Sequence, residues 1–242
     1  MLLDDEDHPM WIVRVLSILA LLGSVLPLAA EEPAWKHPNT SEPGWQDLFQ
    51  ADLSDAIQSG SAWTFNEGIL TASADEVLWT KREFGDCVID LEFKTEPGTN
   101  SGVIVYASDT ANWIPNSVEV QITDDFSEEW SRAPKTWQCG AIFGHLAPRE
   151  SRVKHPGEWN RYTIFCEGHN LRVVLNDGLV TELDMSKWTD ARHNPDGSEI
   201  PEWLSRPMAE LATRGRIGLQ GKHAEAPIWF RHLRIKVPPS RD

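Results

Sequence analysis

The sequence has few cysteines and few basic residues, and both shortages exclude classes of function. Cys87, Cys139 and Cys166 are its three cysteines, an odd number whose spacing fits no zinc site. We expect all three to be small buried residues, as free cysteines usually are. The 22 Lys and Arg against 37 Asp and Glu give a formal net charge of −15. Since no basic stripe offsets this charge, we expect no nucleic-acid partner.

The motifs of several common enzyme classes are also missing. The chain contains no GxSxG, no CxxC and no HExxH, so nothing indicates a serine hydrolase, a thiol oxidoreductase or a zinc peptidase. Asp196-Gly197-Ser198 lacks the other acidic positions of a calcium loop, and we interpret it as a turn. The sequence therefore predicts no resident metal site and no certain cofactor, while a divalent cation stays possible.

A long apolar run occurs at the start of the chain, from Val15 to Ala30. It is shorter than the ~20 residues of a membrane span, and Gly23 and Pro27 interrupt it. Residues 1–30 therefore fit a cleavable secretory signal, which predicts a secreted or periplasmic protein with no membrane insertion after cleavage and no lipid-anchor Cys. Acidic DDED is unusual before such a run, which suggests that translation begins at Met10 and that residues 1–9 are a start-site artefact.

Short strand signals follow a Pro-rich lead, residues 31–43, and predict one β-sandwich domain over residues 44–238. Residues 63–73, WTFNEGILTAS, have the pattern of a hairpin with a turn at 66–68, and residues 176–178 have similar turn chemistry. Pro207 limits the single helical suggestion, residues 201–215, to a turn or two. Residues 194–203 form a long connection that we expect to lie over one face.

One predicted strand carries an unusual polar face. In SVEVQIT, Val118, Val120 and Ile122 point one way while Glu119 and Gln121 point the other, about 7 Å apart at strand rise. Asp124 follows just beyond. On a concave sheet these groups would line a cleft as wide as a sugar ring, whereas on a flat sheet they would be a solvated strand face.

Tryptophan is abundant, with twelve residues, and suits the stacking of sugar rings as well as core packing. We expect core positions for Trp63, Trp79 and Trp229, which lie in strand patterns, and a ligand rim from the loop residues Trp113, Trp130, Trp137 and Trp203. In PGEWNRYTI, Trp159 fits either role, and Lys154 just before it could reach a cleft. Lone histidines such as His145 and His223 are more often structural or solvated than catalytic, so the sequence alone favours a structural role for both.

These pieces, taken in order, resemble the 3-keto-disaccharide hydrolase domain family from about residue 44 to residue 237. The ordered set is GWQDLF, WTFNEGILTA, VLWTKREFGDCVIDLEFK, NSGVIVY, VEVQITDD, CGAIF, KHPGEWNRYTI, LRVVLNDGLV, LDMSKW, NPDGS, RGRIGLQG and WFRHLRI. The resemblance implies an all-β, concanavalin A-like β-sandwich (jelly roll) of two antiparallel sheets with a concave ligand face.

The resemblance also implies action on 3-keto-glycosides or 3-keto-disaccharides. A ketone at C3 acidifies the hydrogen on C2, so a base can remove it to give an enediolate, which expels the group at C1. Water addition completes a net hydrolysis. Such a path needs one base, donors for the enediolate oxygen and an acid for the leaving oxygen. It also needs a partner oxidoreductase upstream to make the ketone.

The resemblance suggests roles for individual residues. Glu119 would be the base or a metal ligand, His145 an alternative acid or base, and Lys154 a cation for the enediolate. The expected substrate-binding positions are Asn100, Tyr106, Gln121, Asp124, Trp159 and Gln220. The chain departs from the family where Tyr106 replaces a frequent Arg, where LQGKHAE displaces His223 by one residue, and where His232 replaces a frequent Asn.

Two other functions fit the same fold. One is a lectin-like module that binds carbohydrate without chemistry. The other is a conventional endo-β-glucanase, whose retaining mechanism needs two carboxyl groups about 5–5.5 Å apart. Gln121 stands where laminarinase-type glucanases have their central acid and Asp124 where they have a Glu, which disfavours that mechanism.

Overall fold

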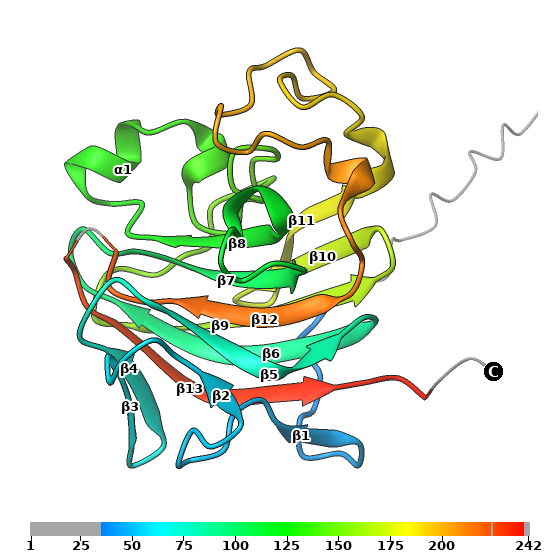
Figure 1. Ribbon diagram of the computed structural model, residues 1–242. Helices are drawn as coiled ribbons and strands as arrows, with labels where there is room; N and C mark the ends of the chain where they lie inside the picture. The colour runs from blue at the N-terminus through cyan, green and yellow to red at the C-terminus, as the bar shows by residue number, and fades with distance from the viewer. Residues whose placement is uncertain (1–34, 224, 240–242) are drawn as a thin grey trace, which may run out of the picture. The chain divides into compact units, whose positions relative to one another are not determined.

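Two antiparallel β-sheets pack face to face in the computed structural model, which describes residues 35–223 and 225–239 (Figure 1). This is the predicted jelly-roll β-sandwich. The predicted signal segment, residues 1–30, lies outside the described residues.

The larger sheet has eight strands. Its order is β11 (Gly178–Asp184), β10 (Asn170–Leu175), β9 (Trp159–Glu167), β6 (Cys87–Thr95), β13 (Ile228–Lys236), β4 (Ile69–Ala72) and β3 (Trp63–Asn66), and β1 (Trp45–Asp47) also pairs with β13. The smaller sheet has the order β2 (Ala56–Ile57), β5 (Val77–Phe84), β12 (Gly215–Gln220), β7 (Asn100–Ala107) and β8 (Val118–Thr123).

Tight turns join the hairpins where the sequence predicted them. Glu67 and Gly68 link β3 to β4 with φ of 48° and 78°. Asn176 and Asp177 link β10 to β11 with φ of 45° and 65°. Two successive positive φ values are typical of the type I′ turn, whose twist matches that of the flanking strands.

The core lies between the sheets and follows the period-2 pattern. Ile89, Leu91 and Phe93 of β6 are fully buried, as are Val120 and Ile122 of β8. Burial of such side chains stabilises each by roughly 1.5–3 kcal/mol relative to exposure. The three cysteines are free and buried, as predicted.

Residues 35–43 lie against the outer face of the eight-stranded sheet. The Trp35 ring meets Phe165 edge-on with 5.0 Å between centroids, and the Arg172 guanidinium lies 4.8 Å from the Trp35 ring. His37 Nδ1 contacts Thr163 Oγ1 at 2.8 Å. The domain boundaries given from the sequence stay predictions.

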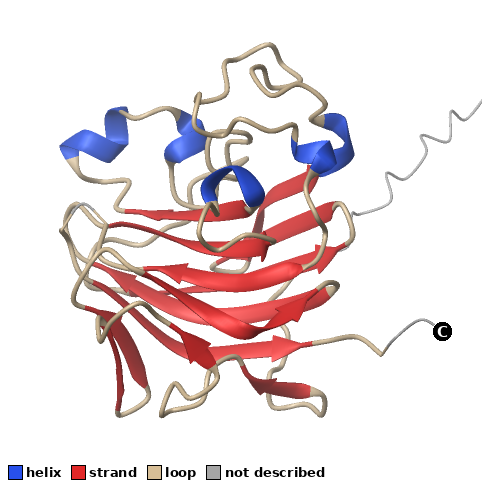
Figure 2. Cartoon of the chain, viewed as in Figure 1, coloured by secondary structure: helices blue, strands red, loops and turns tan. Residues whose placement is uncertain are grey.

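Loops and short helices lie over the outer face of the five-stranded sheet (Figures 1 and 2). They include helix α1 (Glu128–Arg132), which the sequence did not predict, and the 3-10 turns η1 (Ile114–Asn116), η2 (Lys135–Trp137), η3 (Met185–Lys187) and η4 (Met208–Glu210). The connection 194–203 is fixed by Asn194, whose Nδ2 donates to Gly144 O at 3.3 Å and whose Oδ1 accepts from Trp188 Nε1 at 2.9 Å. Within the described part, no helix is long and apolar enough to span a membrane.

Candidate functional site

A pocket of about 760 Å³ opens on the outer face of the five-stranded sheet, which we call the pocket face. Its size is within the usual range for small-molecule sites. Its polar floor consists of Asn100, Glu119, Gln121 and Gln220, and its aromatic walls include Trp79, Trp113, Trp130, Trp137, Phe143 and Trp203. The predicted pair Glu119 and Gln121 therefore lies in a cleft rather than on a solvated strand face.

Strand register explains how the floor is built. One cross-strand row runs from Trp79 on β5 through Gly218 on β12 and Ile104 on β7 to Glu119 on β8. In the adjacent row Gly102 of β7 pairs with Gln121 of β8. A Cβ at Gly218 would lie 2.5 Å from the Trp79 ring, so glycine there makes room for the indole.

Glu119 leans across the floor toward β7. A Cβ built on Gly102 would lie 2.8 Å from Glu119 Cγ and nearer still to its Oε1, so the carboxyl group occupies the space that Gly102 leaves open. The carboxyl group makes no hydrogen bond among the described residues. Burial raises the pKa of Glu119 to about 8, because no charge or donor compensates for the lost hydration. Such a pKa suits proton transfer near neutral pH.

Amide side chains surround this carboxyl group. Gln121 Nε2 donates to Asn100 Oδ1 at 3.1 Å, which fixes both side chains. Gln121 Oε1 is buried and has no partner within the described chain. Since a buried, unsatisfied carbonyl oxygen costs about 1–3 kcal/mol, it calls for an explanation, and a ligand hydroxyl would satisfy it.

A histidine–aspartate pair stands at the rim. His223 Nδ1 contacts Asp75 Oδ2 at 2.7 Å, and both residues line the pocket. The backbone of His223 pairs with that of Asn100, which brings the end of β12 to the floor. Because Asp75 occupies Nδ1 of the His223 ring, Nε2 is the ring nitrogen that can exchange a proton with a ligand.

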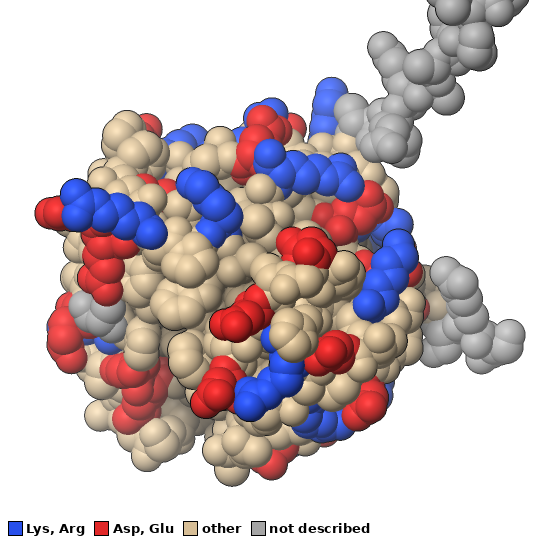
Figure 3. Space-filling view, turned by 90° about the horizontal axis from the view of Figure 1, so that it is seen from above, with Lys and Arg blue, Asp and Glu red and all other residues tan. Residues whose placement is uncertain are grey.

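The loop tryptophans form the walls, as the sequence predicted. Trp113 meets Trp79 edge-on at 6.1 Å, and Trp137 meets Trp203 edge-on at 6.2 Å. Trp203 is 51% exposed, so its ring is available to a ligand. Viewed from above, acidic and basic side chains are interspersed around an uncharged area (Figure 3).

The prediction for Tyr106 is corrected. Strict alternation from Gly102 and Ile104 would turn Tyr106 to the pocket face, but the register of β7 with β12 shifts there and Tyr106 has a φ of 59°. This bulge turns the ring into the core, where its hydroxyl donates to Gly168 O at 2.9 Å. Tyr106 therefore does not contact a ligand in the pocket.

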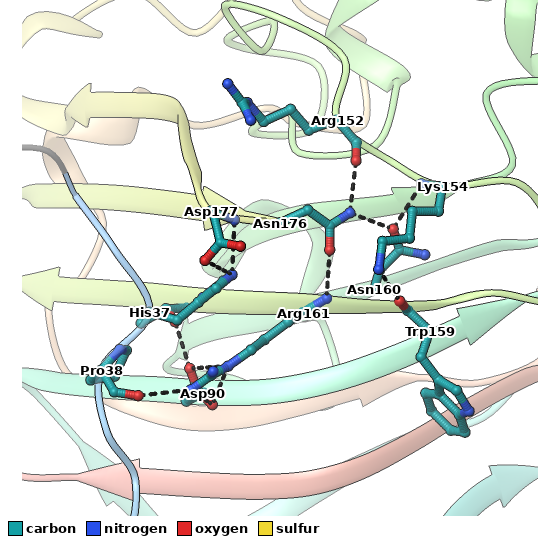
Figure 4. A network of polar contacts seen from close by, with 11 residues as sticks. His37, Pro38, Asp90, Arg152, Lys154, Trp159, Asn160, Arg161, Asn176 and Asp177 are labelled. Atoms are coloured by element: carbon teal, nitrogen blue, oxygen red, sulfur yellow. Dashed lines mark hydrogen bonds and ion pairs between the residues drawn. The ribbon is translucent and has the colours of Figure 1, made fainter.

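The predictions for Lys154 and Trp159 are also corrected. Both belong to a polar network on the eight-stranded sheet (Figure 4), where Lys154 Nζ donates to Trp159 O at 2.9 Å. On the outer face of that sheet, the Arg231 guanidinium lies 4.0 Å and Lys94 Nζ 5.5 Å from the centre of the Trp159 ring. Neither residue lines the pocket.

Asp124 and His145 lie near the pocket without lining it. The Asp124 carboxylate accepts from Gly98 N at 2.9 Å and Phe126 N at 3.1 Å, so it shapes a turn rather than a binding site. His145 is buried in a second, small cavity that Glu119 also lines. Trp79 is buried, as predicted, and also lines the pocket. The core prediction for Trp229 is wrong, because this residue lies half-buried beneath Lys94 on the outer face of the larger sheet.

A divalent cation has few ligands in this pocket. Within the described chain there is no group of three or more His, Cys, Asp or Glu side chains that could hold a metal ion. Glu119 supplies one carboxylate on the floor, Glu76 also lines the pocket, and Asp75 is engaged by His223 at the rim. The residues therefore do not fit a resident metal.

Sequence patterns missed the contribution of Asp75, Trp79 and His223 to one site. Asp75 precedes β5 and His223 follows β12, so about 150 residues of chain separate the two side chains. Only the pairing of β5 with β12 brings them together, and no local pattern encodes that pairing. The single usable signal was His223 itself, just after the predicted floor residue Gln220.

Comparison with family models adds to this geometry. Residues 35–236 match the model of the 3-keto-alpha-glucoside-1,2-lyase-like domain. The chain belongs to this family. Membership in it indicates a carbohydrate-active protein.

Solved structures agree with the fold. A "Putative glycosyl hydrolase" from Parabacteroides distasonis ATCC 8503 is 51% identical over 80% of this chain and 99% of its own, with a TM-score of 0.78. A second putative glycosyl hydrolase from the same organism is 18% identical over 81% and 95% of the two chains, with a TM-score of 0.63, and supports the fold alone. Comparison with curated proteins gives no match.

Proposed function

We propose that the protein cleaves 3-keto-glycosides by elimination followed by hydration. Family membership supports the substrate class, and the pocket supports the reaction type. The observation that carries the proposal is Glu119, a carboxyl group on the pocket floor whose pKa burial raises to about 8 and which has no charged partner among the described residues.

Glu119 is the base in this proposal. Its carboxylate removes the proton from C2 of the oxidised sugar, and the electron pair moves into the enediolate of C2 and C3. Amide N–H groups of Asn100 and Gln220 can donate to the developing negative charge, while Gln121 Oε1 accepts from a sugar hydroxyl. In the next step the enediolate electrons form the C1–C2 double bond and the C1–O bond breaks.

The leaving oxygen needs a proton, and His223 is the group we assign to it. Asp75 holds Nδ1, so a protonated ring can donate from Nε2 at the rim of the pocket. Water then adds across the C1–C2 double bond to give the 3-keto sugar. The net reaction is hydrolysis, and it consumes no oxidant.

One carboxyl group on the floor favours this path over glucanase chemistry. A retaining glucanase needs a second carboxyl group about 5–5.5 Å from the first. Gln121 stands beside Glu119 instead, and the carboxylate of Asp124 is engaged by the backbone of a turn. The aromatic walls suit a lectin-like module as well as an enzyme. A measurement of turnover therefore decides between the proposed enzyme and a binding module.

The proposal includes a cellular setting. The segment 1–30 supports export, so we propose that the enzyme works outside the cytoplasm as a secreted or periplasmic protein. Its substrate carries a ketone that an ordinary glycoside lacks. A partner oxidoreductase of glycosides therefore acts upstream.

The test offers the purified protein a 3-keto-glucoside beside its unoxidised parent, each with and without a chelator. We expect release of the leaving group from the ketone alone, at a rate that the chelator leaves unchanged. Release from the unoxidised parent would instead establish a conventional glycosidase. Saturable binding without release from either compound would establish a binding module.

A further inference from the structure

A small cavity adjoins the open pocket beside Glu119, and Trp113 and Phe143 line both. Its volume is about 10 Å³, close to the space that one water-sized group needs, and both Glu119 and His145 line it. Most of its remaining wall is apolar, including Ile142, Leu204 and Met208, and Ser117 is the other polar residue among the described lining residues. His145 therefore shares this cavity with Glu119 and does not line the open pocket.

The tautomer of His145 follows from its contacts. Nδ1 lies 2.8 Å from Phe143 O, and because a carbonyl oxygen only accepts, Nδ1 carries the proton. Burial lowers the pKa of His145, so the ring is neutral and Nε2 is an acceptor. Nε2 is buried and has no partner among the described residues.

The backbone ties His145 firmly to Glu119. Phe143 N donates to Glu119 O at 3.0 Å, while Phe143 O accepts from His145 Nδ1. One residue thus connects the backbone of β8 to the imidazole ring. His145 is held at a fixed place relative to the Glu119 side chain, as a positioning residue must be.

We propose that His145 Nε2 accepts a hydrogen bond from the protonated Glu119 carboxyl group through this cavity, directly or by one water, and so orients it. The contact directs one carboxyl oxygen to His145 and leaves the other facing the pocket. The catalytic meaning of this contact rests on the proposed function, but the contact itself does not.

The other titratable residues that share a cavity with Glu119 line the open pocket. Asp75, Glu76 and His223 line the open pocket, and His145 is the one titratable partner in the small cavity among the described residues. A change at His145 therefore leaves the titratable groups of the open pocket in place.

The experiment is a ¹³C-carboxyl NMR titration of Glu119, assigned by the signal missing from Glu119→Gln. A hydrogen bond to the neutral acid raises its pKa, so we expect His145→Phe to lower the Glu119 midpoint by about 0.5–1 pH unit. If His145 acted through burial alone, the less polar phenyl ring would raise the midpoint or leave it unchanged. That result would overturn the proposal.

Two further variants make the result interpretable. His145→Gln retains an acceptor, so its midpoint should lie close to that of the unmodified protein, and it serves if the Phe variant does not fold. His155→Phe is the matched control, since His155 stacks on Phe126 at 3.8 Å and lines neither cavity. A midpoint moved equally by His155→Phe would also overturn the proposal.

Kinetics separate this inference from the proposed function. With a 3-keto-glucoside, His145→Phe should lower kcat about 10-fold or more and leave KM unchanged, because His145 does not line the pocket. If the unmodified protein is inactive but His145→Phe lowers the Glu119 midpoint as expected, the proposed function is refuted and the contact between His145 and Glu119 is supported. Active protein with no NMR shift would refute the contact alone.

Discussion

The two outer faces of the sandwich both carry carboxyl groups, but they treat them in opposite ways. On the eight-stranded sheet, Glu92 pairs with Arg231 at 2.6 Å and His232 at 3.2 Å, and Asp90 pairs with Arg161 at 3.0 Å. We call this surface the network face. On the pocket face, Glu119 makes no such contact within the described structure.

Glu92 and Glu119 differ in their ionisation, while Asp90 is intermediate, because burial raises its pKa in spite of the hydrogen bonds from Thr163 and Arg161. Burial raises the pKa of Glu92, but hydrogen bonds and charge from Arg231 and His232 outweigh it and hold that pKa below its ordinary value. Burial acts alone on Glu119 and raises its pKa to about 8. The comparison teaches that a half-buried carboxyl group with partners stabilises the fold, whereas one without partners is available for chemistry.

Matched substitutions on the two faces should have the largest and most divergent effects. Glu119→Gln removes the base, so we expect release from a 3-keto-glucoside to fall by about 10²–10⁴-fold with the melting temperature retained. Glu92→Gln breaks an ion pair, so we expect a loss of about 1 kcal/mol in unfolding free energy and full activity. Comparable turnover in the two variants would remove the distinction between the faces.

Stability as a function of pH should also separate the faces. The folded pKa of Glu119 lies near 8 and its ordinary value is 4.5, so the folded state keeps a proton that the unfolded state releases. The contribution of Glu119 to the free energy of unfolding is therefore complete below about pH 4.5. It is lost as the pH rises to 8, which lowers the free energy of unfolding by at most about 3–5 kcal/mol.

Urea unfolding at pH 5 and pH 8 measures this dependence. Glu119→Gln cannot titrate, so its stability relative to the unmodified protein should increase between the two pH values. Parallel curves for the two proteins would mean that Glu119 has an ordinary pKa when folded.

Gly102→Ala tests whether the position of the Glu119 carboxyl group matters apart from its presence. The added Cβ would displace the end of a flexible side chain, and the backbone of Gly102 is not in the left-handed region, so the fold should remain. We expect activity to fall about 10²-fold, because a shift near 1 Å is enough to misalign a base.

Gly68→Ala is the contrasting control on the hairpin turn. Nothing lies within 4 Å of the added Cβ, but the φ of 78° is strained for alanine. This variant should lose stability and keep its activity. Unchanged activity in Gly102→Ala would show that Glu119 tolerates displacement.

Much of the fold and half of the site followed from the sequence, for a physical reason. Period-2 alternation placed Glu119 and Gln121 on one face, and turn chemistry located both hairpins. Alternation gave the wrong face for Tyr106, because a single bulge in β7 moves the side chains that follow it to the opposite face of the sheet. Alternation also cannot say which sheet faces a pocket, so it could not show that Trp159 lies on the outer face of the eight-stranded sheet.

The smallest expected effect is at the rim, and it compares tryptophans on the two faces. Trp203 is 51% exposed beside the pocket, so Trp203→Ala should raise KM for a 3-keto-glucoside several-fold and leave kcat unchanged, as the loss of uniform binding does. Trp229→Ala on the network face is the control, since Lys94 covers its ring at 4.4 Å and Trp229 does not line the pocket. Equal KM changes in both variants would mean that the proteins are perturbed generally. A lowered kcat in Trp203→Ala would move this residue from binding the sugar to aligning it over Glu119.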